Sequence, residues 1–207
     1  MTPAPLPENA VHAETRAAWR RWLERHHTRA TGVWLVTWKK ASGKPHLGYD
    51  AVVEEALCFG WIDSKPRKLD ANRSMLWCAP RKAGSGWSAP NKRRVEELMA
   101  LGKMAPAGML KVQQAQRDGS WSALDAVEAL EVPPDLRKAL KAHPPAQTHF
   151  DAFPRSARRG ILEWIQNARR PETRAARILQ TATLAQRNER ANQWRGPKSP
   201  LGGKDSP

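Results

Sequence analysis

The chain has 207 residues, of which 40% are hydrophobic and 27% charged, and its formal net charge is +15. This length can bury a hydrophobic core, as one domain or as one domain with a helical extension, and the composition is that of a globular protein. The chain contains no run of about 18 apolar residues that could span a bilayer, which excludes a transmembrane helix.

The first half of the chain predicts a small sheet with helices. Residues 1–13 are rich in proline and are expected to form a flexible lead. A 3.6-residue period over 14–27 predicts a helix whose buried stripe contains Trp19, Trp22 and Leu23. Propensity and turn signals predict a strand at 33–38 and two strands at 61–63 and 74–79, the last two joined by the basic segment 65–73. Capping signals predict a helix at 51–59, with Asp50 as N-cap and Gly60 at its end, and a helix at 89–101 with Ser88 as N-cap.

The second half predicts only helices, which are separated by proline and glycine. The expected helices cover 106–116, 121–130, 134–142, 144–150, 156–168 and 171–190. We therefore expect an α+β protein with a small N-terminal sheet of about three strands, followed by a helical C-terminal half. The predicted regions are a lead (1–13), an α+β region with basic loops (14–104), a helical region (105–195) and a disordered Gly/Pro/Ser tail (196–207).

The positive charge is concentrated in two segments. Residues 64–94 contain nine Lys or Arg against one acidic residue, and residues 155–195 contain ten Arg against three Glu. The rest of the chain is neutral overall. Segregated positive charge favours polyanionic partners, although a solvated basic surface is the alternative explanation.

One stretch resembles a known family. It runs from Tyr49 to Ser64 and contains the string Cys-Phe-Gly-Trp-Ile-Asp, and residues 79–82 and 87–88 extend the resemblance. Residues 150–165 and 170–173 are similar to the helical part of the same family, the YdeI/OmpD-associated (bacteriocin-protection) family. The resemblance implies a protein linked to envelope stress and outer-membrane porin association. It supplies no catalytic residue.

A candidate anion or nucleic-acid site lies in the first basic segment. Lysine and arginine would neutralise phosphates, and Trp77 or Trp87 could stack on bases if exposed. The glycine-bearing loop before the helix at 89–101 could also hold a phosphate at the helix N-terminus. The predicted residues are Lys65, Arg67, Lys68, Arg81, Lys82, Gly84, Ser85, Trp87, Ser88, Lys92 and Arg93. A secondary basic face would comprise Arg155, Arg158, Arg159 and Arg169.

The sequence gives weak support for catalysis and predicts no cofactor or metal. Ser85 lacks the flanking pattern of a nucleophile elbow, and Cys58 follows apolar residues of a short helix, where an inert buried thiol is expected. Asp63 ends an apolar run among basic residues and could act as a general base, but a salt-bridged strand-end residue is the commoner case.

These observations lead to a ranked set of functions. The first is a non-enzymatic, stress-linked protein that binds nucleic acid through a Lys/Arg/Trp surface. The second is an envelope-stress interaction module that binds an acidic protein or an anionic lipid, and the third is an enzyme that uses Asp63 on an anionic small molecule. Two cysteines without a CxxC spacing, and an N-terminus without a secretory signal, predict a cytoplasmic protein.

Overall fold

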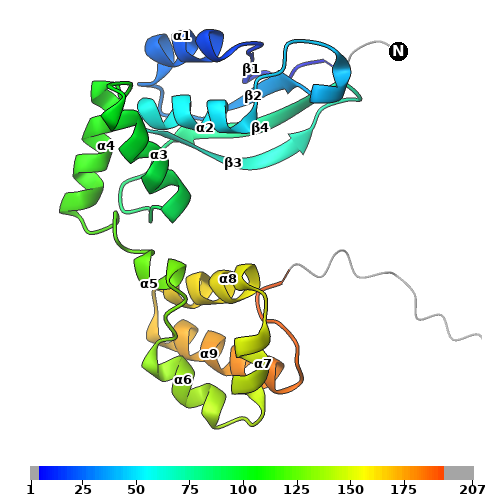
Figure 1. Ribbon diagram of the computed structural model, residues 1–207, viewed down its shortest axis with the longest axis vertical. Helices are drawn as coiled ribbons and strands as arrows, with labels where there is room; N and C mark the ends of the chain where they lie inside the picture. The colour runs from blue at the N-terminus through cyan, green and yellow to red at the C-terminus, as the bar shows by residue number, and fades with distance from the viewer. Residues whose placement is uncertain (1–4, 194–207) are drawn as a thin grey trace, which may run out of the picture. The chain divides into compact units, whose positions relative to one another are not determined.

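A computed structural model of the chain describes residues 5–193, which fold as two compact units that divide between Asp125 and Ala126. The first unit contains a sheet with helices, and the second contains helices (Figure 1). The α+β prediction is thus confirmed. The predicted tail at 196–207 lies outside the described residues.

The sheet of the first unit has four strands in the order β1-β2-β4-β3. Strand β1 pairs parallel to β2, whereas β4 is antiparallel to both β2 and β3. The bounds are Ala10–His12 (β1), Val33–Trp38 (β2), Trp61–Lys68 (β3) and Arg73–Pro80 (β4). The prediction missed β1 and assigned its residues to the lead, because three residues are too few to show an alternating pattern.

Helices α1 (Arg16–His26) and α2 (Tyr49–Cys58) lie over one face of this sheet (Figure 1). Helices α3 (Ala89–Ala100) and α4 (Pro106–Arg117) pack against α2, and a short 3-10 helix, η1, spans Lys40–Ser42. Their buried residues, such as Trp19, Val53 and Val112, form one core with Leu35 and Cys78 of the sheet. The opposite face of the sheet, which carries the residues that alternate with these core residues along each strand, lies outside this core.

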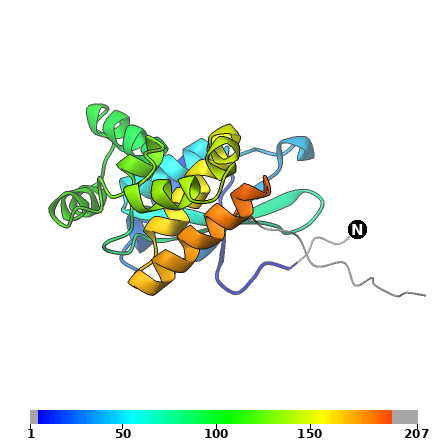
Figure 2. The same ribbon diagram turned by 90° about the horizontal axis from the view of Figure 1, so that it is seen from below.

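The hairpin of β3 and β4 extends beyond α1 and α2 at its turn, beside the segment that follows β2 (Figures 1 and 2). Lys39 Nζ donates hydrogen bonds to the carbonyl oxygens of Asp70 and Ala71, at 2.7 and 2.9 Å. Because β2 is thereby tied to the turn of the hairpin, the far end of the sheet is fixed without a covering helix.

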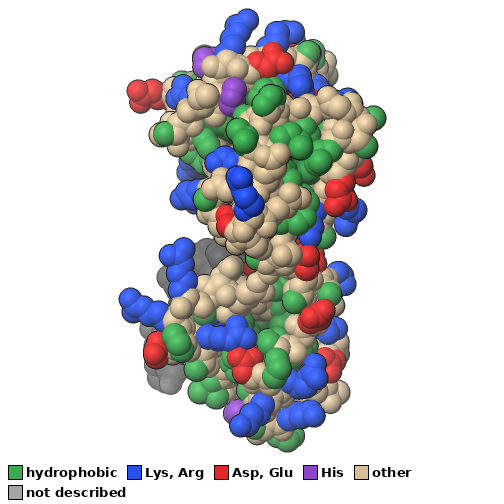
Figure 3. Space-filling model, turned by 90° about the vertical axis from the view of Figure 1, so that its left-hand side faces the viewer, with side chains coloured by type: hydrophobic (Ala, Val, Ile, Leu, Met, Phe, Trp, Pro, Cys, Tyr) green, Lys and Arg blue, Asp and Glu red, His purple; other side chains and the backbone are tan. Residues whose placement is uncertain are grey.

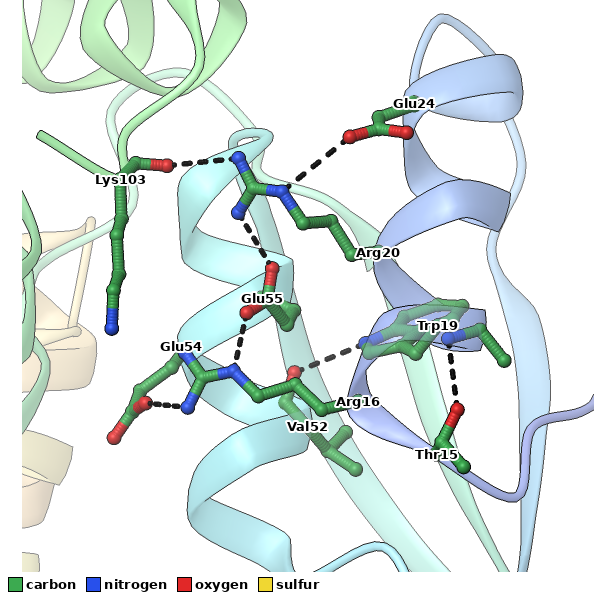
Figure 4. A network of polar contacts seen from close by, with 10 residues as sticks. Thr15, Arg16, Trp19, Arg20, Glu24, Val52, Glu54, Glu55 and Lys103 are labelled. Atoms are coloured by element: carbon green, nitrogen blue, oxygen red, sulfur yellow. Dashed lines mark hydrogen bonds and ion pairs between the residues drawn. The ribbon is translucent and has the colours of Figure 1, made fainter.

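A buried ion cluster joins α1 to α2 (Figure 4). Glu55 is only 2% exposed, and its two carboxylate oxygens accept hydrogen bonds from Arg16 Nε at 2.5 Å and Arg20 Nη1 at 2.8 Å. Arg16 Nη1 also contacts Glu54 at 2.7 Å, and Trp19 Nε1 donates to the carbonyl of Val52 at 3.1 Å. A buried carboxylate needs such partners, so this cluster fixes how the two helices pack.

Helix α4 is the first element of the predicted helical half of the chain, and it packs within the first unit. A Cβ on Gly108 would lie 2.3 Å from the carbonyl oxygen of Cys58, so α4 packs directly on the backbone of α2. Val112 and Ala115 lie in the core of the first unit. Local sequence favours a helix here but does not reveal which core its apolar stripe joins.

Local helix signals were only partly predictive. Gly60 ends α2 with a left-handed φ of 74°, as its position after the apolar run predicts. The N-cap of α2 is Gly48 rather than Asp50, because Asp50 lies inside the first turn and pairs with Arg94 at 2.6 Å. Ser88 is the N-cap of α3, but its side chain makes no capping hydrogen bond.

The second unit consists of helices that pack around α9. Its elements are α5 (Asp125–Glu128), which begins at the boundary, α6 (Pro134–Lys141), α7 (Ala146–Ala152), α8 (Arg155–Gln166) and α9 (Pro171–Gln186). Leu136, Phe150, Ile161 and Ala182 are buried. Helix α5 is shorter than the predicted helix at 121–130, because residues 121–124 form turns.

Candidate nucleic-acid interface

A tryptophan pair lies on the face of the sheet opposite the core. Trp34 of β2 and Trp77 of β4 are direct partners in the strand register, and their rings meet edge to face with centroids 5.2 Å apart. Their neighbours Val33 and Cys78 point into the core, so the tryptophans point away from it. Both indoles are half-buried, which leaves part of each ring open to solvent.

Arg67 links this pair to the edge of the sheet. It lies on β3 opposite Met75, on the same face as Trp77, and its guanidinium carbon is 5.8 Å from the ring centroid of Trp34. This distance is within the range of a cation–π contact. An exposed arginine and a partly exposed indole therefore meet on an open sheet surface.

A second aromatic group continues the same face. The rings of His12 and Trp38 are 5.2 Å apart, and the guanidinium carbon of Arg73 is 5.9 Å from the ring of Trp38. Val36 and Met75, on the same face by register, are almost fully buried. We call Trp34, Trp38, Trp77, Arg67, Arg73 and His12 the outer face.

The basic residues predicted on β3 are exposed along the sheet edge. Lys65, Arg67 and Lys68 all lie in the exposed part of this strand, after an irregularity in register between Asp63 and Pro66. A proline and an irregular register are typical of an edge strand. The edge beside the outer face is therefore positively charged.

The turn that follows β3 is held by a carboxylate. Asp70 accepts hydrogen bonds from the backbone N–H of Arg73 at 2.7 Å and from its Nε at 2.8 Å. The side-chain hydrogen bond from Arg73 is the main cause that lowers the pKa of Asp70 below its ordinary value. The Asp70 carboxylate therefore stabilises the turn by pairing with Arg73, and it does not pair with Lys65, Arg67 or Lys68.

The loop at 81–88 is built differently from its predicted form. Trp87 is 1% exposed and lies under Arg81, whose guanidinium carbon is 3.7 Å from the ring centroid. Trp87 therefore cannot stack on a base, and of the two tryptophans predicted for that role only Trp77 is accessible. Lys82 and Gly84 are exposed, and Ser85 donates its hydroxyl hydrogen to the carbonyl of Lys82 at 2.7 Å.

The two predicted basic residues of α3 differ in the contacts that their side chains make. Lys92 contacts Asp125 at 2.7 Å and lies 5.4 Å from the ring centroid of Trp121. Arg93 is exposed. The predicted set of residues thus divides into an exposed strip on β3 and a loop whose central arginine and tryptophan are buried.

The predicted secondary basic face, in the second unit, is largely engaged in local contacts. Arg159 contacts Glu128 and Glu163, each at 2.8 Å, while Arg155 donates to the carbonyl of Glu128 at 2.5 Å. Arg158 approaches Asp151 at 4.0 Å, and Arg169 is exposed. On the face seen in Figure 3, Lys and Arg are interspersed with acidic and hydrophobic side chains instead of forming one patch.

Asp63 has a partner on the protein surface. Its Oδ2 accepts a hydrogen bond from the hydroxyl of Tyr49 at 2.9 Å, and the Tyr49 side chain is largely exposed. Cys58 and Cys78 are buried free thiols, and burial is the main cause that raises the pKa of each. Such thiols are poor nucleophiles.

Two further properties concern the described part of the chain. Within residues 5–193, no group of three or more His, Cys, Asp or Glu side chains is arranged to hold a metal ion. The helices described there include none with both the length and the apolar character needed to cross a membrane.

Sequence reasoning did not select Trp34, Trp38 or His12 for this surface. The alternation of residues 33–38 and 74–79 contained a usable signal, since Trp34, Val36 and Trp38 share one face of their strand. The identity of the partner strand and its register was needed to place Trp34 opposite Trp77.

Two family models match different parts of the chain. Residues 129–188, within the helical unit, match the family described as Bacteriocin-protection, YdeI or OmpD-Associated. Residues 11–111, within the sheet unit, match a Domain of unknown function (DUF8412). Searches of curated proteins and of solved structures found no match. The resemblance seen in the sequence is confirmed for the helical unit, whose residues 129–188 are similar to the Bacteriocin-protection, YdeI or OmpD-Associated family.

Proposed function

We propose that this chain binds single-stranded nucleic acid on the outer face of its sheet. The observation that carries the proposal is the Trp34–Trp77 pair, with Arg67 over Trp34. Partly exposed indoles on an open sheet can stack on bases, whatever the base sequence, because every base has a π-face. The arginine adds a positive charge next to the stacking surface.

The edge of the sheet supports the proposal through charge. Lys65, Arg67 and Lys68 are exposed on β3 and have no acidic partner among the described residues. Phosphates of a bound strand would meet these side chains while its bases lie on the tryptophans. A single strand fits better than a duplex, because stacking needs bases that are not already paired.

The test is fluorescence anisotropy with labelled single-stranded and double-stranded oligonucleotides over a series of salt concentrations. We expect tighter binding of the single strand, with log affinity falling linearly against log salt. Lys65→Glu/Lys68→Glu should reduce affinity by about tenfold or more and make the salt slope less steep by about one per lost phosphate contact.

A matched control separates a site from general charge. Lys138→Glu/Lys141→Glu changes two exposed lysines of α6 in the second unit and gives the same net charge. It should leave affinity within about twofold. If both double variants weaken binding equally, or if no binding occurs at about 50 mM salt, the proposal is wrong.

Stacking is tested separately from charge. Trp34→Leu should cost about 1–3 kcal/mol of binding free energy, whereas Trp34→Phe should retain most of the affinity because it keeps an aromatic ring. Circular dichroism of each variant checks that the sheet is intact. Equal losses for both substitutions would indicate that the ring does not stack.

A second candidate function rests on the family match of the helical unit. The description of that family refers to bacteriocin protection and to association with OmpD. We propose as the alternative that this unit contacts an acidic protein or an anionic lipid surface. Cosedimentation with phosphatidylglycerol vesicles, compared with phosphatidylcholine vesicles, tests the lipid form, and equal recovery with both would exclude it.

A further inference from the structure

A groove of the first unit lies where the segments that follow α1 and α2 meet α4. Its volume is about 600 Å³, within the range of about 300–1,000 Å³ that is usual for small-molecule sites. Phe59, Gly60 and Trp61, from the string Cys-Phe-Gly-Trp-Ile-Asp, line it together with residues of α4. The groove therefore belongs to a part of the chain that the outer face does not use.

Close contacts fix the segments that form this groove. Gly60 has a φ of 74°, and a Cβ at this position would lie 2.6 Å from Cγ of Lys111, so the stem of this lysine rests against the glycine. Trp61 Nε1 donates a hydrogen bond to the carbonyl oxygen of His27 at 2.9 Å, which ties the end of α1 to β3. The groove is thus formed before any ligand binds.

Much of the lining is apolar. Phe59 and Trp61 form its buried part, whereas Leu110 of α4 is 61% exposed. Covering such a leucine with an apolar group removes it from water, which is favourable. The lining therefore favours a ligand with an apolar part.

The charged side chains of the lining are positive. They are Arg29 and Lys111, and neither forms an ion pair within residues 5–193. His27 Nδ1 lies 3.0 Å from the carbonyl oxygen of Leu23, which can only accept, so Nδ1 carries a hydrogen and Nε2 is the nitrogen available to a ligand. A lining with two cations and no acidic side chain attracts an anion.

We propose that this groove binds a small amphipathic carboxylate, in which a carboxylate group is joined to an apolar tail. The carboxylate would contact Arg29 and Lys111, and the tail would cover Phe59 and Leu110. Guanidinium and ammonium groups form charge-assisted hydrogen bonds with carboxylates. An inorganic anion would leave the apolar lining uncovered, and a neutral apolar molecule would leave both cations unused. The groove shares no residue with the outer face, so either proposal can fail alone.

The test is isothermal titration of the whole chain with octanoate and with hydrocinnamate, which have an aliphatic and an aromatic tail. Binding of either supports the proposal. Affinity should rise by about threefold for each CH₂ added between butanoate and octanoate. Acetate lacks the tail and octanol lacks the charge, and each should bind at least about tenfold more weakly than octanoate. If neither carboxylate binds at millimolar concentration, or if acetate or octanol binds as tightly as octanoate, the proposal is wrong.

Variants place the ligand in the groove. Arg29→Gln/Lys111→Met removes both positive charges but keeps the stem that rests on Gly60, and it should weaken octanoate binding by about tenfold. Leu110→Ser removes apolar contact at an exposed position and should weaken it by about threefold.

Each variant has a matched control in the first unit, outside the groove. Arg93→Gln/Lys103→Met removes two exposed positive charges, and Leu101→Ser changes a leucine that is 64% exposed. Both controls should bind octanoate as the original chain does, and circular dichroism checks that every variant is folded. Equal binding by the folded groove variants and their controls would overturn the proposal.

Discussion

The hydroxyl of Tyr49 donates a hydrogen bond to Asp63 Oδ2 at 2.9 Å, which links the first turn of α2 to β3. Tyr49 is the single tyrosine of the chain. Desolvation is the main cause that raises its pKa, to about 12, and the hydrogen bond to Asp63 and its negative charge add to the shift. The carboxylate of Asp63, which the sequence offers as a candidate general base, thus helps to hold α2 against β3.

Tyr49 should therefore ionise at a pH near 12, and its titration can be followed without interference from another tyrosine. Asp63→Asn should bring the pKa down towards the ordinary value of about 10, although not fully, because the desolvation remains. Ultraviolet absorbance during alkaline titration measures the midpoint, and circular dichroism reports whether the chain is still folded. A midpoint that Asp63→Asn does not move would contradict the assigned role of the hydrogen bond.

The sign of this shift also predicts alkaline stability. A pKa raised in the folded state means that folding favours the protonated hydroxyl. Its stabilising contribution is complete below about pH 10 and is lost as the pH rises towards about 12. Tyr49→Phe should therefore flatten the fall of unfolding free energy over this range.

Glu55 should be much more sensitive to substitution than Glu54. Glu55→Gln removes a buried charge that two arginines share, and we expect a loss of about 1–3 kcal/mol in the free energy of unfolding. Glu54→Gln affects a more exposed pair with Arg16 and should cost no more than about 1 kcal/mol. Urea unfolding of both variants measures the difference. Equal losses would mean that burial of Glu55 does not set the strength of the cluster.

Two glycines inside helices should respond to alanine in opposite directions. Gly108→Ala places a methyl group against the carbonyl of Cys58, and overpacking should outweigh the better helix propensity, with a net loss of about 1–2 kcal/mol. A Cβ on Gly160 of α8 meets nothing within 4 Å, so Gly160→Ala should stabilise by about 0.5–1 kcal/mol. Thermal unfolding of both variants tests the pair. A stabilising Gly108→Ala would disprove the close packing of α4 on α2.

Local chemistry accounts for the parts of the fold that the sequence predicts well. Gly60 follows an apolar helical run and takes the left-handed conformation that ends α2, and residues 33–38 have the β-branched and aromatic content of a strand. The unit boundary was not predictable in this way. It depends on the contact of Gly108 with Cys58, which are 50 positions apart in the chain.

The candidate site was predicted only in part, because some of its residues depend on long-range contacts. Lys65, Arg67 and Lys68 were selected by charge density, and an exposed edge strand keeps them accessible. Trp34 entered only with the register of β2 on β4. Trp87 could stack on a base only if exposed, but it is buried beneath Arg81, and no local pattern reveals such a contact.

The acid stability of the second unit should depend on Asp135. Arg174 contacts both of its carboxylate oxygens, at 2.7 and 3.0 Å, and this hydrogen bonding is the main cause that lowers the pKa of Asp135 from 3.8. A depressed pKa stabilises the folded state above the unfolded value, and this contribution is lost as the pH falls through about 4 and below. Asp135→Asn should be less stable than the original chain near pH 7, and the two should converge at low pH. Urea unfolding between about pH 3 and pH 7 measures the convergence. If the stability of Asp135→Asn instead runs parallel to that of the original chain across this pH range, the ion pair makes no pH-dependent contribution to stability.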